Sequence, residues 1–173
     1  MTILAVSLLA ALQTFTFTRD GIGPIDVTTP VDHARIAKLF PKLSVKDTVD
    51  QQSEDADWPT VSVFQGGEEL LQLSPCDAGP LGKICIVYSR SRSARTADGV
   101  RVGDPYPKVA SKVKECSAGF EKEAGKVICH SVAAGNVLVL FGRAGVTKEG
   151  MPSDAELKKY RAVELRWLPP TPD

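Results

Sequence analysis

The four cysteines are the residues whose spacing says most about chemistry. They fall into two close pairs, Cys76 with Cys85 and Cys116 with Cys129. An even number of closely spaced cysteines is typical of a disulfide framework in an exported protein, although four cysteines allow three connectivities. Zinc is the rival interpretation, but neither pair has the C-x2–4-C spacing of a zinc ribbon, and a redox role lacks its C-x-x-C motif. We therefore expect two structural disulfides and no metal site.

Histidine chemistry would depend on His33 and His130, the two histidines of the chain. Consecutive residues of a strand point to opposite faces, so His130 cannot act as the base for Cys129. His33 falls in the first turn of an expected helix, where the helix dipole disfavours protonation. The sequence also lacks the G-x-S-x-G, H-E-x-x-H and phosphate-loop motifs. These observations predict no catalytic residue, no cofactor and a function other than catalysis.

Basic residues gather between positions 90 and 114, after a stretch rich in acidic residues. Strand alternation would place Tyr88, Arg90 and Arg92 on one face. The functional interpretation is a face for an anionic partner, such as a phosphate-bearing glycolipid or an acidic protein. The alternative is that the two charged blocks face each other or solvate loops. The net charge of zero gives no overall field that would attract nucleic acid.

Carboxylates supply an alternative, a hydrolase of the cell envelope. Its candidates are Asp98, Asp104, Asp154 and Glu156. Such an enzyme needs two carboxylates that converge in a pocket, one of them with a raised pKa. Asp104, Asp154 and Glu156 already fit capping positions of helices, which weakens this hypothesis.

Two similar patterns position these residues. Residues 20–22 lead through Thr29 and Pro30 into helical spacing at 31–40, and residues 98–100 lead through Asp104 and Pro105 into a second helix at 106–116. Thr29 and Asp104 suit the cap position, and each proline suits the first helical position. The second helix would end at Cys116.

Alternating segments follow each helix. The strands are expected at 60–64, 69–73, 84–89, 126–131 and 136–141, with residues 47–57 as an exposed connection. Cys76 and Cys85 would then face each other across a hairpin, and a bridge from Cys129 to Cys116 would fix the second helix to the sheet. Ser153 and Glu156 form a capping box that begins a helix reaching Tyr160, before a last strand at 162–168.

The predicted fold class is therefore α+β, a mainly antiparallel sheet covered by two or three short helices. It comprises two β-α-β-β-like halves, pseudo-repeats at about 20–90 and 98–168, within a single domain at 19–170. Residues 3–12 form an apolar run too short to cross a bilayer but suited to the core of a signal peptide. Residues 1–18 are expected to form a signal-like segment, and the alternative is a buried strand or helix at the start.

The later part of the chain resembles the bacterial family called domain of unknown function 1131, which comprises envelope lipoproteins linked to the extracytoplasmic stress sigma factor. The resemblance covers about residues 20–168 and includes residues 99–109 (GVRVGDPYPKV) and 149–160 (EGMPSDAELKKY). The most specific motif comprises Met151, Pro152, Ser153 and Asp154.

The resemblance implies that Cys116 pairs with Cys129, whereas Cys76 and Cys85 are an addition. It also implies a periplasmic or envelope location. Leu12 stands where such lipoproteins carry the lipidated cysteine, so we expect no lipid anchor. The predicted function is that of a non-enzymatic exported accessory protein, which binds an envelope partner or ligand through one sheet face or the cleft between its halves. A purely structural or inhibitory module is a further alternative.

Overall fold

The computed structural model describes residues 13–50, 58–77 and 82–170. Within these residues, one sheet has eight strands in the order β4-β5-β6-β7-β12-β11-β10-β9, and a second has four in the order β3-β2-β1-β8. The strands are β1 (Phe15–Phe17), β2 (Gly21–Ile22), β3 (Ile25–Asp26), β4 (Ser44–Asp50), β5 (Trp58–Gln65), β6 (Glu68–Pro75), β7 (Ile84–Ser89), β8 (Ala94–Thr96), β9 (Val113–Ala118), β10 (Val127–Ser131), β11 (Val137–Gly142) and β12 (Arg161–Trp167).

Three short α-helices accompany these strands: α1 (His33–Leu39), α2 (Tyr106–Val109) and α3 (Asp154–Leu157). Single 3-10 turns follow at η1 (Ala110–Lys112) and η2 (Glu121–Glu123). The fold is thus mostly antiparallel β-sheet, with less helical cover than an α+β sequence pattern predicts. No helix in the described part of the chain is long and apolar enough to cross a membrane.

One face of the large sheet is apolar because strand alternation directs the same kind of side chain to it from neighbouring strands. Val61, Leu73, Val87, Trp167 and Val137 are cross-strand partners in turn, from β5 across to β11. All five are buried. This row runs through both halves of the sheet, so the two halves share one core.

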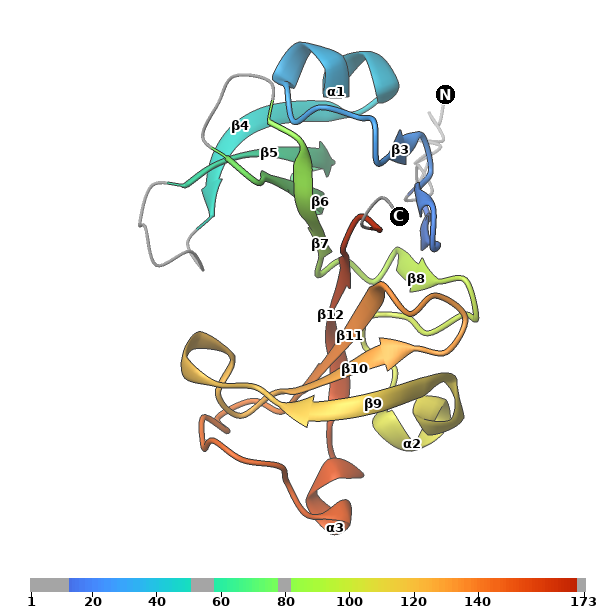
Figure 1. Ribbon diagram of the computed structural model, residues 1–173, viewed down its shortest axis with the longest axis vertical. Helices are drawn as coiled ribbons and strands as arrows, with labels where there is room; N and C mark the ends of the chain where they lie inside the picture. Colours follow the sequence, from blue (N-terminus) through green and yellow to red (C-terminus); the bar gives the residue numbers. More distant parts are fainter. Residues whose placement is uncertain (1–12, 51–57, 78–81, 171–173) are drawn as a thin grey trace, which may run out of the picture.

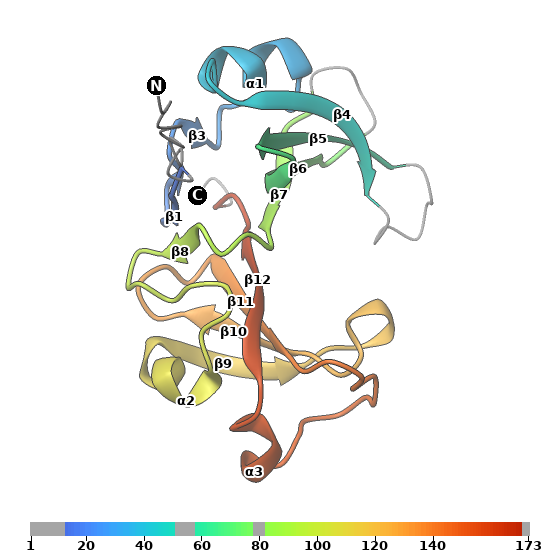
Figure 2. The same cartoon turned by 180° about the vertical axis from the view of Figure 1, so that it is seen from behind.

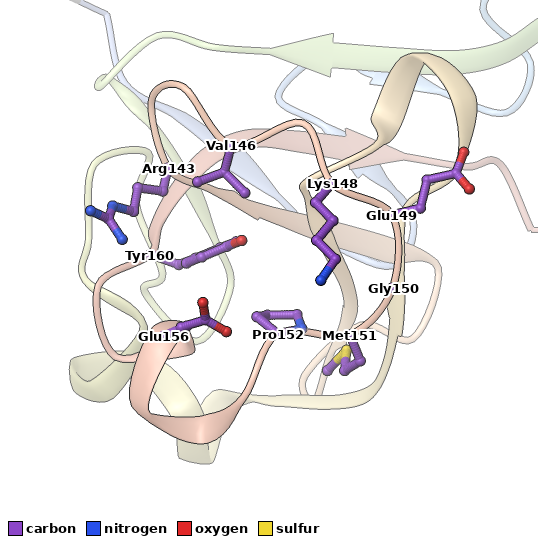
Figure 3. A pocket seen from close by; sticks show the side chains of 9 residues that line it. All are labelled: Arg143, Val146, Lys148, Glu149, Gly150, Met151, Pro152, Glu156 and Tyr160. Carbon is purple, nitrogen blue, oxygen red and sulfur yellow. The ribbon is translucent and has the colours of Figure 1, made fainter.

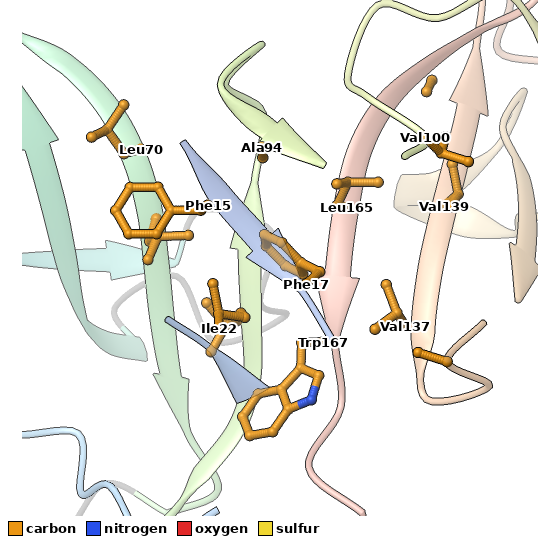
Figure 4. Packing of buried hydrophobic residues seen from close by; sticks show 14 of the residues in the cluster. Phe15, Phe17, Ile22, Leu70, Ala94, Val100, Val137, Val139, Leu165 and Trp167 are labelled. Carbon is orange, nitrogen blue, oxygen red and sulfur yellow. The ribbon is translucent and has the colours of Figure 1, made fainter. Parts of the chain in front are cut away.

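The small sheet packs on this core (Figure 4). β1 pairs in parallel with β8 and carries Phe15 and Phe17, both buried. The ring of Phe15 meets that of Phe40, after α1, edge to face at 5.8 Å. The folded domain therefore begins before residue 19, and the predicted signal-like segment ends too late at residue 18. The apolar run at 3–12 lies outside the described residues.

The two halves of the chain meet at β7 and β12 (Figures 1 and 2). These strands are antiparallel and pair Ser89 with Leu165, Tyr88 with Arg166, and Val87 with Trp167. The first half contributes α1 and then β4 to β7, and the second contributes α2 and then β9 to β12, with α3 before the last strand. The pseudo-repeat itself stays a prediction.

Several predicted boundaries and caps are wrong. The cap of α1 is Asp32, whose carboxylate accepts a hydrogen bond from Arg35 N–H at 2.9 Å. Thr29 instead closes the preceding turn on Asp26. Asp104 likewise accepts from Arg101 N–H, and Pro105 occupies the cap position of α2.

The second helix is much shorter than predicted, because residues 113–118 form β9 and pair with β10. Pairing with an existing strand satisfies the backbone and buries Val113, which outweighs a helical pattern of only a few residues. The predicted exposed connection is also wrong in part, since β4 extends to Asp50 and pairs with β5 along its whole length. The other predicted strands are present, with ends shifted by a few residues.

Candidate functional site

The second face of the large sheet is polar, including at positions that are buried. Ser62, Gln72, Tyr88 and Arg166 are cross-strand partners in turn from β5 to β12. Ser62 and Gln72 are buried, and each has a hydrogen-bond partner: Ser62 bonds with Thr48 at 2.7 Å and Gln72 donates to Thr60 at 3.2 Å. Buried polar groups that are all paired rigidify a sheet face.

The predicted basic face lies at the β12 end of this polar row, and acidic groups compensate it. Arg90 Nε lies 2.7 Å from Glu164 Oε2, and Arg166 also pairs with Glu164. The guanidinium groups of Arg90 and Arg166 lie 6.0 and 5.3 Å from the ring centre of Tyr88. The Tyr88 hydroxyl donates to Asp50 Oδ2 at 3.3 Å. Tyr88 and Arg90 therefore belong to an ion network formed by the chain's own residues, in which the Arg90 side chain is 41% exposed.

Arg92 does not share a strand with Tyr88, because β7 ends at Ser89. It lies exposed in the following turn. Strand alternation therefore fails as the reason to group Tyr88, Arg90 and Arg92. Binding of an anionic partner by these residues stays a prediction.

The network changes the acidity of its members. Burial raises the pKa of Tyr88 to about 12, and the negative charge of Asp50 adds to the effect. Burial alone would lower the pKa of Arg166, but Glu164 and Glu123 raise it overall. At neutral pH the Tyr88 hydroxyl is therefore neutral and the Arg166 guanidinium is charged.

Glu123 links this network to the turn at residues 119–124, of which residues 120–122 are exposed. Burial alone would raise the pKa of Glu123, but hydrogen bonds from Arg166 and Lys126 lower it overall. Within the same turn, Phe120 is 66% exposed, more than any other large apolar residue of the described chain. The turn therefore anchors one carboxylate in the sheet and presents one aromatic ring to solvent.

Several close contacts and hydrogen bonds fix the backbone conformation of the turn that carries Phe120. A Cβ on Gly119 would lie 2.2 Å from the carbonyl oxygen of Glu123. Glu121 has a left-handed φ of 50°, which costs energy for a non-glycine residue. Backbone hydrogen bonds from Glu123 to Phe120 and from Ala124 to Glu121 close the turn at 2.8 and 3.0 Å. Strain held by so many contacts is common at sites that bind ligands.

The four candidate carboxylates of the hydrolase hypothesis interact with residues close to them in the chain or in neighbouring strands. Asp98 accepts from Thr96 and, at 3.4 Å, from Ser131. Asp104 pairs with Lys108 at 2.7 Å; burial alone would raise its pKa, but the hydrogen bonds of Lys108 and Arg101 N–H lower it.

Glu156 completes the predicted capping box, which is confirmed, by accepting from Ser153 N–H at 3.1 Å. Hydrogen bonds from Ser153 lower its pKa. Asp154 is the first residue of α3 and is exposed. Asp104 and Glu156 thus have lowered pKa values, opposite to what a general acid needs.

Both predicted cysteine pairs are confirmed as disulfides, Cys76–Cys85 and Cys116–Cys129. Each joins neighbouring strands where the register shifts, between β6 and β7 and between β9 and β10. The expectation that Cys116 ends a helix is wrong, so the second disulfide fixes strand to strand instead of helix to sheet. Among the described residues, no group of His, Cys, Asp and Glu could hold a metal ion.

Met151 and Pro152, the first two residues of the motif Met151, Pro152, Ser153 and Asp154, line a pocket of about 160 Å³ (Figure 3). The loop after β11 and the helix α3 supply its walls, and Tyr160 closes the inner end. The lining residues are Arg143, Val146, Lys148, Glu149, Gly150, Met151, Pro152, Glu156 and Tyr160.

Sequence reasoning did not single out Phe120, Lys148 or Tyr160 as functional residues. An aromatic residue in a charged turn between two strands is the one signal that could have indicated Phe120. Tyr160 fits the apolar face of a helix in the sequence, and its place in a pocket depends on how the loop after β11 folds over it.

The comparisons with known proteins give a family from one match and a similar fold from another. The sequence model of the family described as protein of unknown function (DUF1131) matches residues 8–168. The crystal structure of the uncharacterized protein YfeY from Escherichia coli is similar, with a TM-score of 0.66 and 18% identity, over 91% of this chain and 99% of that one. No curated protein matches the chain.

Proposed function

We propose, from the premise that this chain belongs to the DUF1131 family of proteins of unknown function, that it is a non-enzymatic exported protein that binds a partner protein in the cell envelope. The observation that carries the proposal is Phe120, 66% exposed on a turn held rigid by its backbone and by Glu123. The two disulfides support an oxidising compartment.

A rigid exposed aromatic residue is suited to anchor a protein interface. Aromatic side chains supply much of the binding energy of interfaces, and pre-ordering reduces the entropy lost on binding. A second exposed apolar residue, Met151, lies close in the chain to Glu149, whose carboxylate accepts from Glu121 N–H at 3.4 Å. We define the Phe120 surface as the turn at 119–124 together with Glu149 and Met151.

The charges beside Phe120 favour a protein partner over a membrane surface. Glu121 and Glu149 are acidic, the charge of Glu123 is matched by its pairs with Arg166 and Lys126, and Lys122 is the one cation within the turn itself. Anionic lipid headgroups attract clusters of Lys and Arg and repel a surface of this composition. We therefore assign Phe120 to an apolar recess on a partner protein.

Site-specific crosslinking in the envelope tests the proposal. The photoreactive residue p-benzoylphenylalanine replaces Phe120, Met151 or, as a matched control, Val132, which is 53% exposed on another loop. We expect the same protein adduct from positions 120 and 151 and no such adduct from position 132. In the unlabelled protein, Phe120→Ser should reduce capture of that partner at least tenfold, because an interface anchor is lost.

Two outcomes would contradict the proposal. Identical adducts from all three positions would show non-specific collision, and lipid adducts without a protein adduct would assign the surface to a membrane. The hydrolase alternative is not advanced, since Asp104 and Glu156 have lowered pKa values.

A further inference from the structure

Four arginine side chains gather around the loop that follows β8. Arg95, within β8, and Arg101 are partners in an antiparallel bridge, so their side chains lie next to each other on one face. The other two approach Gly103. The Arg161 guanidinium donates to the Gly103 carbonyl at 3.1 Å, and Arg92 Nε lies 3.8 Å from the position that a Cβ on Gly103 would take. We define the arginine surface as Arg92, Arg95, Arg101 and Arg161.

Hydrogen bonds to β12 fix the backbone of this loop. Gly103 N–H donates to the carbonyl of Ala162 at 2.7 Å, and Ala162 N–H donates to that of Asp104 at 2.9 Å. The Asp104 carboxylate accepts from Arg101 N–H at 2.9 Å and pairs with Lys108 at 2.7 Å, so its own charge is matched. A loop that is ordered before binding loses little entropy when a ligand contacts it.

The four guanidinium groups have no carboxylate partner. None of them forms an ion pair within the part of the chain that the structure describes. Arg92, Arg101 and Arg161 are exposed, and Arg95, whose Nε donates to Thr16 Oγ1 at 3.1 Å, is partly exposed. Their charges therefore remain available to an anion from outside the chain.

Carboxylates near the arginine surface do not cancel its charge. Asp98 lies within the loop, and Glu68 and Glu69 begin β6, where Glu68 accepts from the Ser91 hydroxyl at 2.5 Å. Lys112 adds a fifth cation, because its Nζ approaches the same loop. Five cations thus stand against three carboxylates in one region, whereas the whole chain has a net charge of zero. Charges this close together act as one positive field at physiological ionic strength.

The composition of this region favours a lipid surface over a protein partner. Protein interfaces have an apolar and aromatic core inside a polar rim. Within residues 92–105 no large apolar side chain is among the exposed ones. Val132 borders the region, since its N–H donates to the carbonyl of Lys112 at 2.9 Å, but one valine does not make an apolar core. Anionic lipid headgroups attract clusters of Lys and Arg by charge alone.

We propose that the arginine surface binds the anionic headgroups of a lipid bilayer, with guanidinium N–H groups donating to phosphate oxygens. This site is separate from the Phe120 surface. β8 and the loop after it lie on the opposite side of the second half from the turn between β9 and β10 (Figures 1 and 2). The chain bound to a membrane through its arginines therefore leaves Phe120 accessible to a partner protein.

Sedimentation with lipid vesicles tests the proposal on the full chain. The probe is a phosphatidylcholine vesicle that contains about 30% phosphatidylglycerol, and pure phosphatidylcholine is the neutral comparison. We expect stronger binding to the anionic vesicles, and this excess should decline as salt is added, because ions screen the charges. The apolar run at 3–12 is common to all variants, so differences between variants report on the substituted residues.

A double variant tests the assigned residues. Arg92→Gln with Arg101→Gln should weaken binding to anionic vesicles about 25-fold, since each cation near such a surface contributes about fivefold. Both side chains are exposed, so the fold should remain intact. The matched control is Arg35→Gln with Lys38→Gln on α1, which removes the same charge from exposed positions and should leave vesicle binding unchanged.

Three results would overturn the proposal. Equal binding to neutral and anionic vesicles would exclude recognition of charged headgroups. An equal loss in both double variants would reduce the effect to net charge. Binding of polyglutamate that depends on Arg92 and Arg101, without binding to anionic vesicles, would assign the surface to an acidic protein. Phe120→Ser should leave vesicle binding unchanged, and a loss there would contradict the separation of the two surfaces.

Discussion

Arg90 and Glu164 form an ion pair across the line where the two halves of the sheet meet, with Arg90 Nε 2.7 Å from Glu164 Oε2. Arg90 follows β7, and Glu164 lies within β12 and is 1% exposed. The same carboxylate accepts from Arg166. A buried carboxylate that serves two arginines holds the polar face of both strands together.

Glu164→Gln should destabilise the protein strongly. The substitution keeps the shape of the side chain but removes one of the two carboxylates that pair with Arg166, the other being Glu123, and we expect a cost of about 1.5–3 kcal/mol. The free energy of unfolding from urea denaturation under non-reducing conditions measures the change. Glu115→Gln is the control, because its pair with Lys114 is exposed, and it should change stability by less than about 0.5 kcal/mol. Equal effects of the two variants would contradict the importance of the buried pair.

Alkaline pH should weaken the fold through Tyr88. Its pKa is about 12 in the folded protein and about 10 in the unfolded chain. The unfolded chain therefore loses this proton first, and the stabilisation, complete below pH 10, declines as the pH rises through 12. Unfolding free energies measured between pH 9 and 12 should fall more steeply for the unmodified protein than for Tyr88→Phe. Parallel curves would show that Tyr88 ionises normally.

Acidic pH should act through Glu123. Its folded pKa lies below the ordinary value of 4.5, so its stabilisation is present above that value and is lost as the pH falls through the folded pKa. Glu123→Gln should be less stable at pH 7, and the gap to the unmodified protein should narrow below pH 4.5. Glu121→Gln, in the same turn, removes a carboxylate that forms no ion pair among the described residues, and it should change stability at pH 7 by less than about 0.5 kcal/mol. A constant gap for Glu123→Gln would contradict the assigned linkage.

The two disulfides should differ in their resistance to reduction. Cys76 and Cys85 are exposed, whereas Cys129 is wholly buried. Thiol exchange requires access to a sulfur atom, so the first bridge should open at lower concentrations of dithiothreitol. Alkylation after brief reduction, followed by peptide mass spectrometry, measures the order. Faster alkylation of Cys116 and Cys129 would contradict the prediction.

Gly119→Ala should lower the free energy of unfolding, whereas Phe120→Ser should leave it almost unchanged. The added Cβ of alanine would meet the carbonyl of Glu123 at 2.2 Å, and we expect a loss of about 1–3 kcal/mol in unfolding free energy. Phe120 is 66% exposed, so its replacement should change stability by less than about 0.5 kcal/mol. Urea denaturation compares both variants. A large loss of stability for Phe120→Ser would indicate that this ring serves the fold and not a partner.

Local patterns predicted much of the secondary structure. The alternation at residues 84–89 and the capping box of Ser153 and Glu156 are local features, and both occur as predicted. Residues 113–116 were misassigned to a helix because a pattern of only a few residues is weak, and the strand β10 that claims them lies further along the chain. The cap at Thr29 was misassigned because Asp26 competes for its hydroxyl.

The sequence by itself determined the family, the cysteine pairs and the strand-rich pattern, because spacing, turn chemistry and alternation act between near neighbours. Tertiary structure alone decided that Arg90 is paired with Glu164, 74 positions away, and that Tyr160 faces a pocket with Lys148. Charge compensation and pocket geometry depend on which strands become neighbours. That choice is made by burial of the shared apolar face, to which residues from the whole chain contribute.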